Sequence, residues 1–155
     1  MSEGSLAFNP EFDPDGGEGG VDTNLLPWLP LSGVSGLSLK PLRASMESGM
    51  FNVIVRLEKG AVLERLLSLS GMDLLVLSGN LDYSDSNGDS RLEPGIWGYL
   101  SANTCMQRLT AADEAELLVN CYGAFAMLTS GNQVDRLVTS ADIRQMALQA
   151  GISMV

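Results

Sequence analysis

Short stretches in which apolar and polar residues alternate recur along this chain, separated by clusters of Gly, Pro, Asn and Asp. Residues 51–57 (FNVIVRL) show the period-two pattern with β-branched residues that is typical of a half-buried strand. Further apolar stretches predict strands at 73–77, 96–100, 115–122 and 124–128. Strands spaced by roughly 8 to 14 residues, with turn signals between them, predict an all-β sandwich or barrel.

Turn residues mark where these strands end. Residues 83–89 (YSDSNGD) combine Ser, Asn, Asp and Gly, which adopt left-handed backbone or bond to their own backbone, so this segment predicts a hairpin turn. The apolar segment 25–42 is interrupted by Pro27, Pro30 and Pro41. Prolines at this spacing prevent a long helix and favour extended or edge structure.

One segment has the period of an amphipathic helix, residues 140–150 (SADIRQMALQA). Ser140 is a candidate N-cap, and Gly151 is suited to end the helix. The apolar positions share one face at helical spacing; they are Ile143, Met146, Ala147 and Ala150. We expect this helix to cover part of a sheet or a dimer seam.

The charge is concentrated at the start of the chain. Residues 1–23 hold six acidic residues, several glycines and no Lys or Arg, whereas the whole chain has a net charge of −10. Such a segment cannot bury enough apolar surface to offset its ordering entropy. We therefore predict an acidic disordered tail over residues 1–23 and a single domain over residues 24–155.

Composition excludes several classes of function. The acidic balance argues against binding to nucleic acid or to anionic membranes, and no apolar run is long enough to span a bilayer. The chain contains no His, so catalytic triads with imidazole and all imidazole metal sites are excluded. Two cysteines do not make a disulfide framework, and the N-terminus lacks the pattern of a secretory signal. We expect a cytoplasmic protein.

Two segments resemble the conserved motifs of the cupins: residues 55–79 (VRLEKGAVLERLLSLSGMDLLVLSG) and residues 92–106 (LEPGIWGYLSANTCM). Gly60, Gly79 and Gly95 occupy glycine positions of these motifs. The resemblance covers about residues 26–151 and extends to two groups within the cupins. One is the acetylacetone-cleaving and dihydroxyacetophenone dioxygenase group, and the other is the cupin domain of ChrR-type anti-sigma factors. It implies a cupin double-stranded β-helix, that is, a jelly-roll barrel, with a short C-terminal helix.

The resemblance also implies where a metal would be bound in a cupin. In this frame Leu66, Ser68 and Met106 stand at the histidine positions, and Met72 stands at the glutamate position. Enzymatic cupins hold a divalent metal, usually Fe(II), through imidazole and carboxylate ligands. A hydrocarbon, a hydroxyl and two thioethers do not make such a site. We therefore expect no metal, no cofactor and no catalytic residue.

Two alternatives would keep a metal in the barrel. Asp73 is a neighbour of the glutamate position, but strand alternation points it to the opposite face from Met72, so we interpret it as a solvent-facing or turn-side acid. Cys105, Met72 and Met106 are soft donors that would suit copper. Methionine is, however, the usual filler of irregular apolar space, which favours a packed interior.

Trp97 and Tyr99 flank the second motif at positions i and i+2, so both face one side of a strand. If that side is the barrel interior, they line a ligand pocket together with Leu66, Ser68, Met72 and Met106. If it is the exterior, they belong to a dimer interface. Ordinary packing is the third possibility that the sequence leaves open.

These observations lead to one functional hypothesis and two alternatives. We predict a degenerate, metal-free cupin that forms a homodimer and acts as a small-molecule-binding or regulatory module, with a small apolar or aromatic ligand in the barrel. The first alternative is a dioxygenase-like enzyme that cleaves diketones or hydroxyaryl ketones at a non-standard site. The second is an interaction domain of the anti-sigma type.

Overall fold

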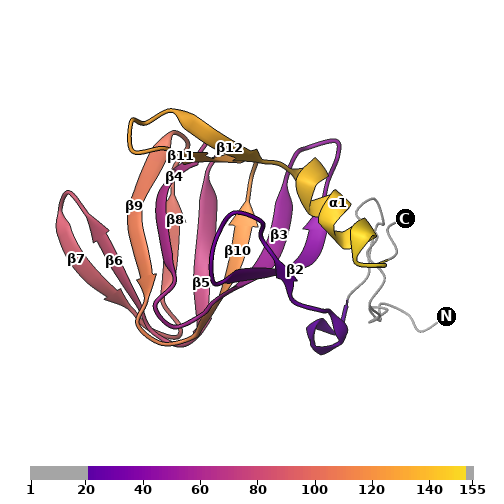
Figure 1. Ribbon diagram of the computed structural model, residues 1–155, viewed down its shortest axis with the longest axis horizontal. Coiled ribbons are helices and arrows are strands. Elements are labelled where there is room, and N and C mark those ends of the chain that lie inside the picture. Colours follow the sequence, from indigo (N-terminus) through magenta and orange to yellow (C-terminus); the bar gives the residue numbers. More distant parts are fainter. Residues whose placement is uncertain (1–20, 153–155) are drawn as a thin grey trace.

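Two six-stranded antiparallel sheets face each other in the computed structural model, which describes residues 21–152 (Figure 1). The first sheet has the order β1 (Leu29–Pro30), β2 (Leu37–Ala44), β3 (Phe51–Leu57), β10 (Ala115–Cys121), β5 (Met72–Ser78) and β8 (Trp97–Leu100). The second has the order β12 (Val134–Val138), β11 (Phe125–Leu128), β4 (Val62–Ser68), β9 (Thr104–Ala111), β6 (Leu81–Asp85) and β7 (Gly88–Leu92). The predicted all-β class is confirmed.

The inner faces of the two sheets meet in an apolar core. In β3, buried residues alternate with half-buried ones from Phe51 to Leu57, as the sequence pattern predicts for this strand. The central strand β10 pairs with β3 on one side and β5 on the other, and places Leu117 and Cys121 on the same inner face. In β3 and β10, period-two patterning therefore decides which side of the strand faces the core.

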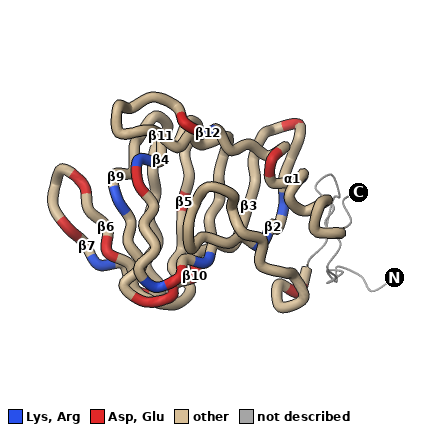
Figure 2. Tube along the Cα trace, in the orientation of Figure 1, with Lys and Arg blue, Asp and Glu red and all other residues tan. Residues whose placement is uncertain are grey.

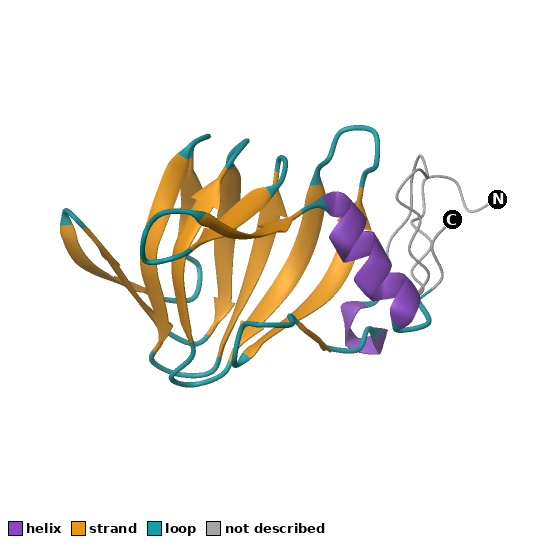
Figure 3. Ribbon diagram, turned by 45° about the horizontal axis from the view of Figure 1, so that its top comes forward, coloured by secondary structure: helices purple, strands orange, loops and turns teal. Residues whose placement is uncertain are grey.

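A short C-terminal helix, α1 (Ser140–Gln149), lies across one end of the strand layers (Figure 3). Its N-cap is Thr139, not Ser140 as the sequence analysis predicted. The Thr139 hydroxyl accepts a hydrogen bond from the backbone N–H of Asp142, whose carboxylate accepts one from the N–H of Thr139. This reciprocal capping box satisfies two donors that the first turn leaves free. The helix packs against β2 and buries Ile143 and Ala147.

The described part of the chain starts at Val21, three residues before the predicted start of the domain at residue 24. Most of the expected tail, residues 1–20, lies outside the described residues. Val21, however, packs against the core, and Thr23 begins a short 3-10 helix, η1 (Thr23–Leu25). The side chain of Asp22 caps this turn by accepting a hydrogen bond from the N–H of Asn24. Residues 21–23, which the sequence analysis includes in the tail, therefore take part in this turn and in the packing against the core.

Charged residues are dispersed over the outside of the sandwich. Lys and Arg alternate with Asp and Glu along the strands and loops (Figure 2). Of the charged side chains in the part of the chain that the structure describes, Asp73 is the one classed as buried. The predicted hairpin turn is confirmed at residues 85–88, between β6 and β7, and this hairpin projects from the sandwich (Figure 1). No helix between residues 21 and 152 is long and apolar enough to cross a membrane.

Candidate functional site

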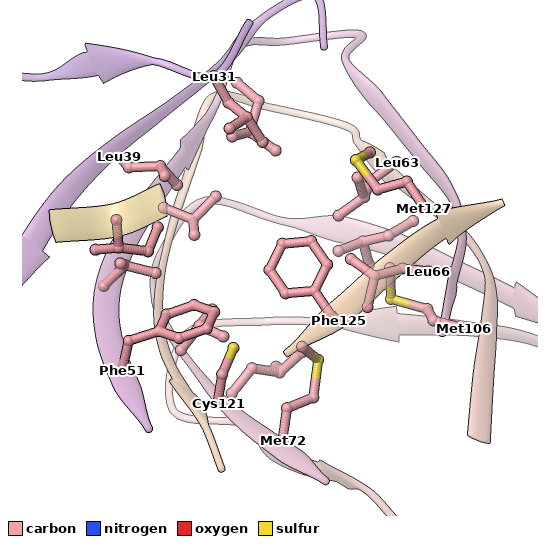
Figure 4. A pocket seen from close by; sticks show the side chains of 17 residues that line it. Leu31, Leu39, Phe51, Leu63, Leu66, Met72, Met106, Cys121, Phe125 and Met127 are labelled. Carbon is pink, nitrogen blue, oxygen red and sulfur yellow. The ribbon is translucent and has the colours of Figure 1, made fainter. Parts of the chain in front are cut away.

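A small cavity of about 60 Å³ lies between the two sheets (Figure 4). Both sheets supply its wall, together with the residue after β1 and one residue of α1. The residues that line it are Leu31, Leu37, Leu39, Phe51, Val53, Val55, Leu63, Leu66, Met72, Leu74, Met106, Leu109, Val119, Cys121, Phe125, Met127 and Ile143. Every one of these side chains is a hydrocarbon, a thioether or a thiol, so the wall offers no strong hydrogen-bonding group.

Three of the residues singled out in the sequence meet at this cavity. Leu66 of β4 lies opposite Met106 of β9 in the second sheet, and Met72 of β5 reaches the cavity from the first sheet. Their exposed fractions are 4%, 3% and 5%. Two motifs that are far apart in the sequence therefore contribute side chains to one enclosed apolar space.

Ser68 is buried but takes no part in the cavity wall. Its hydroxyl accepts a hydrogen bond of 2.9 Å from the backbone N–H of Gly71. That bond lies within the turn between β4 and β5, so the hydroxyl closes a local loop. Ser68 thus has a structural partner of its own.

The structure places Trp97 and Tyr99 away from the cavity. Both lie on β8 at the edge of the first sheet, and their side chains are 62% and 57% exposed. The two rings stack on each other with centroids 6.4 Å apart. The expectation that they line the pocket is therefore corrected, because alternation placed them on one face but could not say which face was inside.

Asp73 forms a polar network on the other side of β5. Its carboxylate accepts a hydrogen bond of 2.7 Å from the Asn120 amide and a second one from the Tyr122 hydroxyl. The Asn120 side chain in turn accepts one from the Asn52 amide. Asp73 is only 7% exposed, so the solvent-facing part of the interpretation is corrected. Its direction, opposite to that of Met72, and its place beside a turn agree with the sequence analysis. The hydrogen bond to Asp73, followed by burial, raises the pKa of Tyr122.

Cys121 is the one cavity residue with an ionisable side chain. Burial is the main cause that raises the pKa of its thiol to about 12, and the nearby Asp73 carboxylate adds to the effect. The thiol stays protonated at neutral pH and is a poor nucleophile in this state. Cys121 therefore behaves as a small apolar residue of the wall, as the sequence analysis expected of a buried cysteine.

Sequence comparison decides the family. The model of the ChrR cupin-like domain matches residues 17–126, which is more than half of the chain. The chain belongs to the ChrR cupin-like family. A search of curated proteins found no match.

Solved cupin structures share this fold. An acetylacetone dioxygenase from Acinetobacter johnsonii matches with a TM-score of 0.71 at 13% identity, over 79% of this chain and 85% of that one. A putative acetylacetone dioxygenase from Methylibium petroleiphilum gives 0.76 at 17% identity, over 83% and 92%. A cupin-like protein of unknown function from Ralstonia eutropha gives 0.76 at 19%, over 86% and 88%. At these identities the likeness shows the fold alone.

The cupin motifs imply a metal, and the donors present do not fit one. Leu66 has no donor atom, and the Ser68 hydroxyl is engaged with Gly71. Met72 and Met106 offer thioethers, which do not suit Fe(II) or Zn(II). Between residues 21 and 152, no group of three or more His, Cys, Asp and Glu could hold a metal ion. The residues at these positions therefore do not fit the metal that the cupin motifs imply.

Most residues of the cavity wall could not be predicted as site residues from the sequence. Phe125 and Met127 were assigned to a strand, but no motif linked that strand to the site. Ile143 was placed on the apolar face of a helix expected to cover part of a sheet or a dimer seam, but that sheet was not identified. Only the topology, which lays β11 beside β4 and α1 on β2, brings these residues to the wall.

Proposed function

We propose that this cupin is a binding or regulatory domain that holds a small apolar molecule in its interior cavity without a metal. The observation that supports this proposal is the cavity itself. Three residues at the ligand positions of the cupin frame, Leu66, Met72 and Met106, line it, and its wall is apolar throughout. Apolar cavities of this kind stay dry and accept apolar guests, because water finds no hydrogen-bonding partners in them.

The dimensions limit the class of ligand. A single water molecule occupies about 10–15 Å³ on the same measure, so about 60 Å³ accommodates a molecule of only a few heavy atoms. A charged or strongly polar ligand would lose its hydration without gaining a partner. An aromatic ring needs more room, which Met72, Met106 and Met127 could supply by changing rotamer, because methionine side chains are flexible. We therefore propose uncharged aliphatic molecules, or a single small ring, as ligands.

Xenon is a suitable probe because it is spherical, apolar and small. Protein labelled with ¹³C in the methionine methyl groups would be titrated with xenon under pressure and followed by NMR. We expect saturable shifts at Met72, Met106 and Met127, which line the cavity. The methyl group of Met46, whose side chain is 52% exposed, serves as the internal reference and should not move.

A matched pair of variants tests whether the cavity is responsible. Val53→Leu adds a methylene group to the cavity wall, and Val134→Leu makes the same change at a side chain that is 62% exposed. Val53→Leu should weaken xenon binding at least about threefold, since it removes part of the free volume. Val134→Leu should bind xenon like the wild type. Absence of xenon-dependent shifts in the wild type would contradict the proposed function.

The enzymatic alternative makes the opposite prediction about metals. A dioxygenase-like cupin would contain about one equivalent of tightly held iron, zinc or copper and would consume dioxygen with small diketones. We expect elemental analysis of the purified protein to find far less than one equivalent. Metal-dependent oxygen uptake with a diketone would overturn our proposal in favour of the enzyme.

The remaining parts of the proposal concern setting and partners. We propose a cytoplasmic homodimer that binds neither nucleic acid nor membrane. Two cysteines that are both free are compatible with a reducing compartment. As a regulatory module, the domain would signal ligand occupancy through the end of the barrel where α1 and the loops meet the cavity. Co-purification of a partner protein would identify the target of such regulation.

A further inference from the structure

A surface cleft of about 510 Å³ lies directly beside the interior cavity. The loop of residues 33–36, the turn between β3 and β4 and the start of β4 form its sides, and Met127 of β11 completes it. Leu63 and Met127 line both the cleft and the cavity. A wall one side chain thick therefore separates the cavity from solvent at this point. Figure 4 shows these two side chains next to each other on one side of the cavity.

The two side chains of this wall differ in how firmly they are held. Leu63 lies within β4, is 9% exposed and faces Leu109 of the neighbouring strand β9. Met127 is half-buried on β11, which pairs with β12 through an irregular register between Met127 and Leu128. Methionine is unbranched and has three rotatable side-chain bonds. The backbone of Met127 also pairs in regular register with Leu66 of β4, so the mobile part is its side chain alone. This side chain is the more flexible of the two in the wall.

The opposite side of the cleft is fixed by ties between elements. The N–H of Glu58 donates a hydrogen bond of 2.9 Å to the carbonyl of Gly36. The guanidinium of Arg136, on β12 in the second sheet, donates to the carbonyl of Ser32. The loop is therefore held at both of its ends, and the cleft exists without any rearrangement of the backbone. Leu63 and Met127 are the residues that the cleft and the cavity share.

We infer that small uncharged ligands enter the cavity from this cleft and that Met127 is the gate. This inference rests on the proposed function, because it describes the route to the same cavity. Glu58, Lys59 and Glu64 surround the outer part of the cleft, whereas the passage itself is bounded by Leu63 and Met127. A charged molecule can reach the cleft but loses its hydration at the passage. The gate therefore selects against charge as well as size.

The test measures the exchange rate of xenon separately from its affinity, using saturation-transfer NMR on dissolved ¹²⁹Xe with the full chain. Met127→Ala removes most of the side chain that blocks the passage, which lowers the barrier to the movement of xenon. The exchange rate of xenon should therefore rise at least about tenfold. Met127→Phe replaces the methionine with a bulkier, stiffer side chain and should slow exchange by about the same factor. Met46→Ala removes an exposed methionine outside both linings and should leave the rate as in the wild type.

The outcomes separate this inference from the proposed function. If the wild type binds xenon but all Met127 variants exchange it at the wild-type rate, the gate is wrong and the cavity proposal stands. If the wild type binds no xenon, both are wrong. If Met127→Ala fails to fold, Met127→Leu, which keeps the volume but adds a branch, carries the test together with Met127→Phe. A change in affinity with an unaltered association rate would also contradict the gate.

Discussion

At the scale of single residues, the glycines of the cupin frame and the residues at its ligand positions have separate physical roles. Gly79 has a φ of +78°, and a Cβ atom there would lie 2.2 Å from the carbonyl oxygen of Glu114. Gly60 has a φ of +86° but no atom within 4 Å of such a Cβ. Both glycines are required by the backbone, not by a ligand. This explains how the frame can be recognised in a chain whose ligand positions hold other residues.

The two glycines allow a matched prediction on stability. Gly60→Ala should lower the free energy of unfolding by about 1–2 kcal/mol, the cost of left-handed backbone for an L-residue. Gly79→Ala adds a collision with the backbone and should cost about 3 kcal/mol or more. Urea unfolding of both variants followed by circular dichroism measures the difference. Equal losses would show that the close approach at Gly79 is relieved by a small shift.

The buried thiol predicts a pH dependence of stability. The pKa of Cys121 is about 12 in the folded state against an ordinary value of 9.0. Below pH 9 the thiol is protonated in both states, so its full contribution is present. Above pH 9 the unfolded chain loses the proton first, and stability should fall by about 1.4 kcal/mol per pH unit until the folded pKa is reached.

Urea unfolding under reducing conditions at about pH 8 and about pH 10 checks this slope. The slope between these values should be smaller in Cys121→Ala and unchanged in Cys105→Ala, which removes the less buried of the two cysteines. An equal loss of stability in all three proteins would assign the effect to other groups, such as the tyrosines.

At the scale of elements, the sequence predicts best the strand in which β-branched residues and an unbroken alternation of burial coincide. Residues 51–57 were predicted with the bounds that β3 has. In contrast, β9 was not predicted, because its buried positions 106 and 109 are an odd number of residues apart. Its neighbour β4 has the same break between Leu63 and Leu66, with Arg65 at a φ of +50° between them. Because both strands are irregular, they remain in register with each other. A search for strict alternation of apolar and polar residues, however, finds neither of them.

The helix cap predicts a measurable contribution from one hydroxyl. Thr139→Ala removes the acceptor for the N–H of Asp142 and should cost about 1 kcal/mol of stability. Thr129→Ser is the control, because it changes another threonine but keeps the hydroxyl that accepts a hydrogen bond in the turn after β11. Its stability should match that of the wild type. Thermal unfolding by calorimetry is sensitive enough for the comparison. A loss below a few tenths of a kcal/mol would mean that Asp142 alone caps the helix.

At the scale of the whole molecule, the outer face of the first sheet exposes several large apolar side chains. The outer side of the first sheet presents Trp97, Tyr99 and Leu77, which are 62%, 57% and 44% exposed. At the other end of this face the Trp28 ring lies against the cationic groups of Lys40 and Arg56, at 4.6 and 4.4 Å. The homodimer expected from the sequence is a prediction that this surface makes testable.

We predict that a second copy of the chain packs on the Trp97–Tyr99 end of this face. Exposed aromatic residues are the usual anchors of such interfaces, so the double variant Trp97→Ser with Tyr99→Ser should weaken the dimer at least about tenfold. Sedimentation velocity over a range of concentrations measures the dissociation constant. Leu148→Ser changes an apolar residue of α1 that is 48% exposed and serves as control. A wild-type monomer, or a double variant that dimerises normally, would contradict the prediction.

The candidate site was predictable only in part, and for a physical reason. The glycine spacing placed Leu66, Met72 and Met106 in one region, and the structure brings these three to one cavity. Ser68 fits the same spacing but turns to a local backbone N–H instead. The opposite wall, the gate and the cleft depend on which strands become neighbours. That information lies in long-range pairing, which residue patterns along a single segment do not contain.

The order of the strands has a consequence for how the chain reaches this structure. Among the strands of residues 21–152, β10 joins β1–β3 to β5 and β8 in the first sheet, and β9 joins β4 to β6 and β7 in the second. Ala115 pairs with Leu57, so the sequence separation across these contacts is large. The two parts of each sheet cannot join until β10 in the first sheet and β9 in the second have paired with both of their neighbours. Such topologies fold in milliseconds to seconds, since loop closure is costly before the pairing energy is gained.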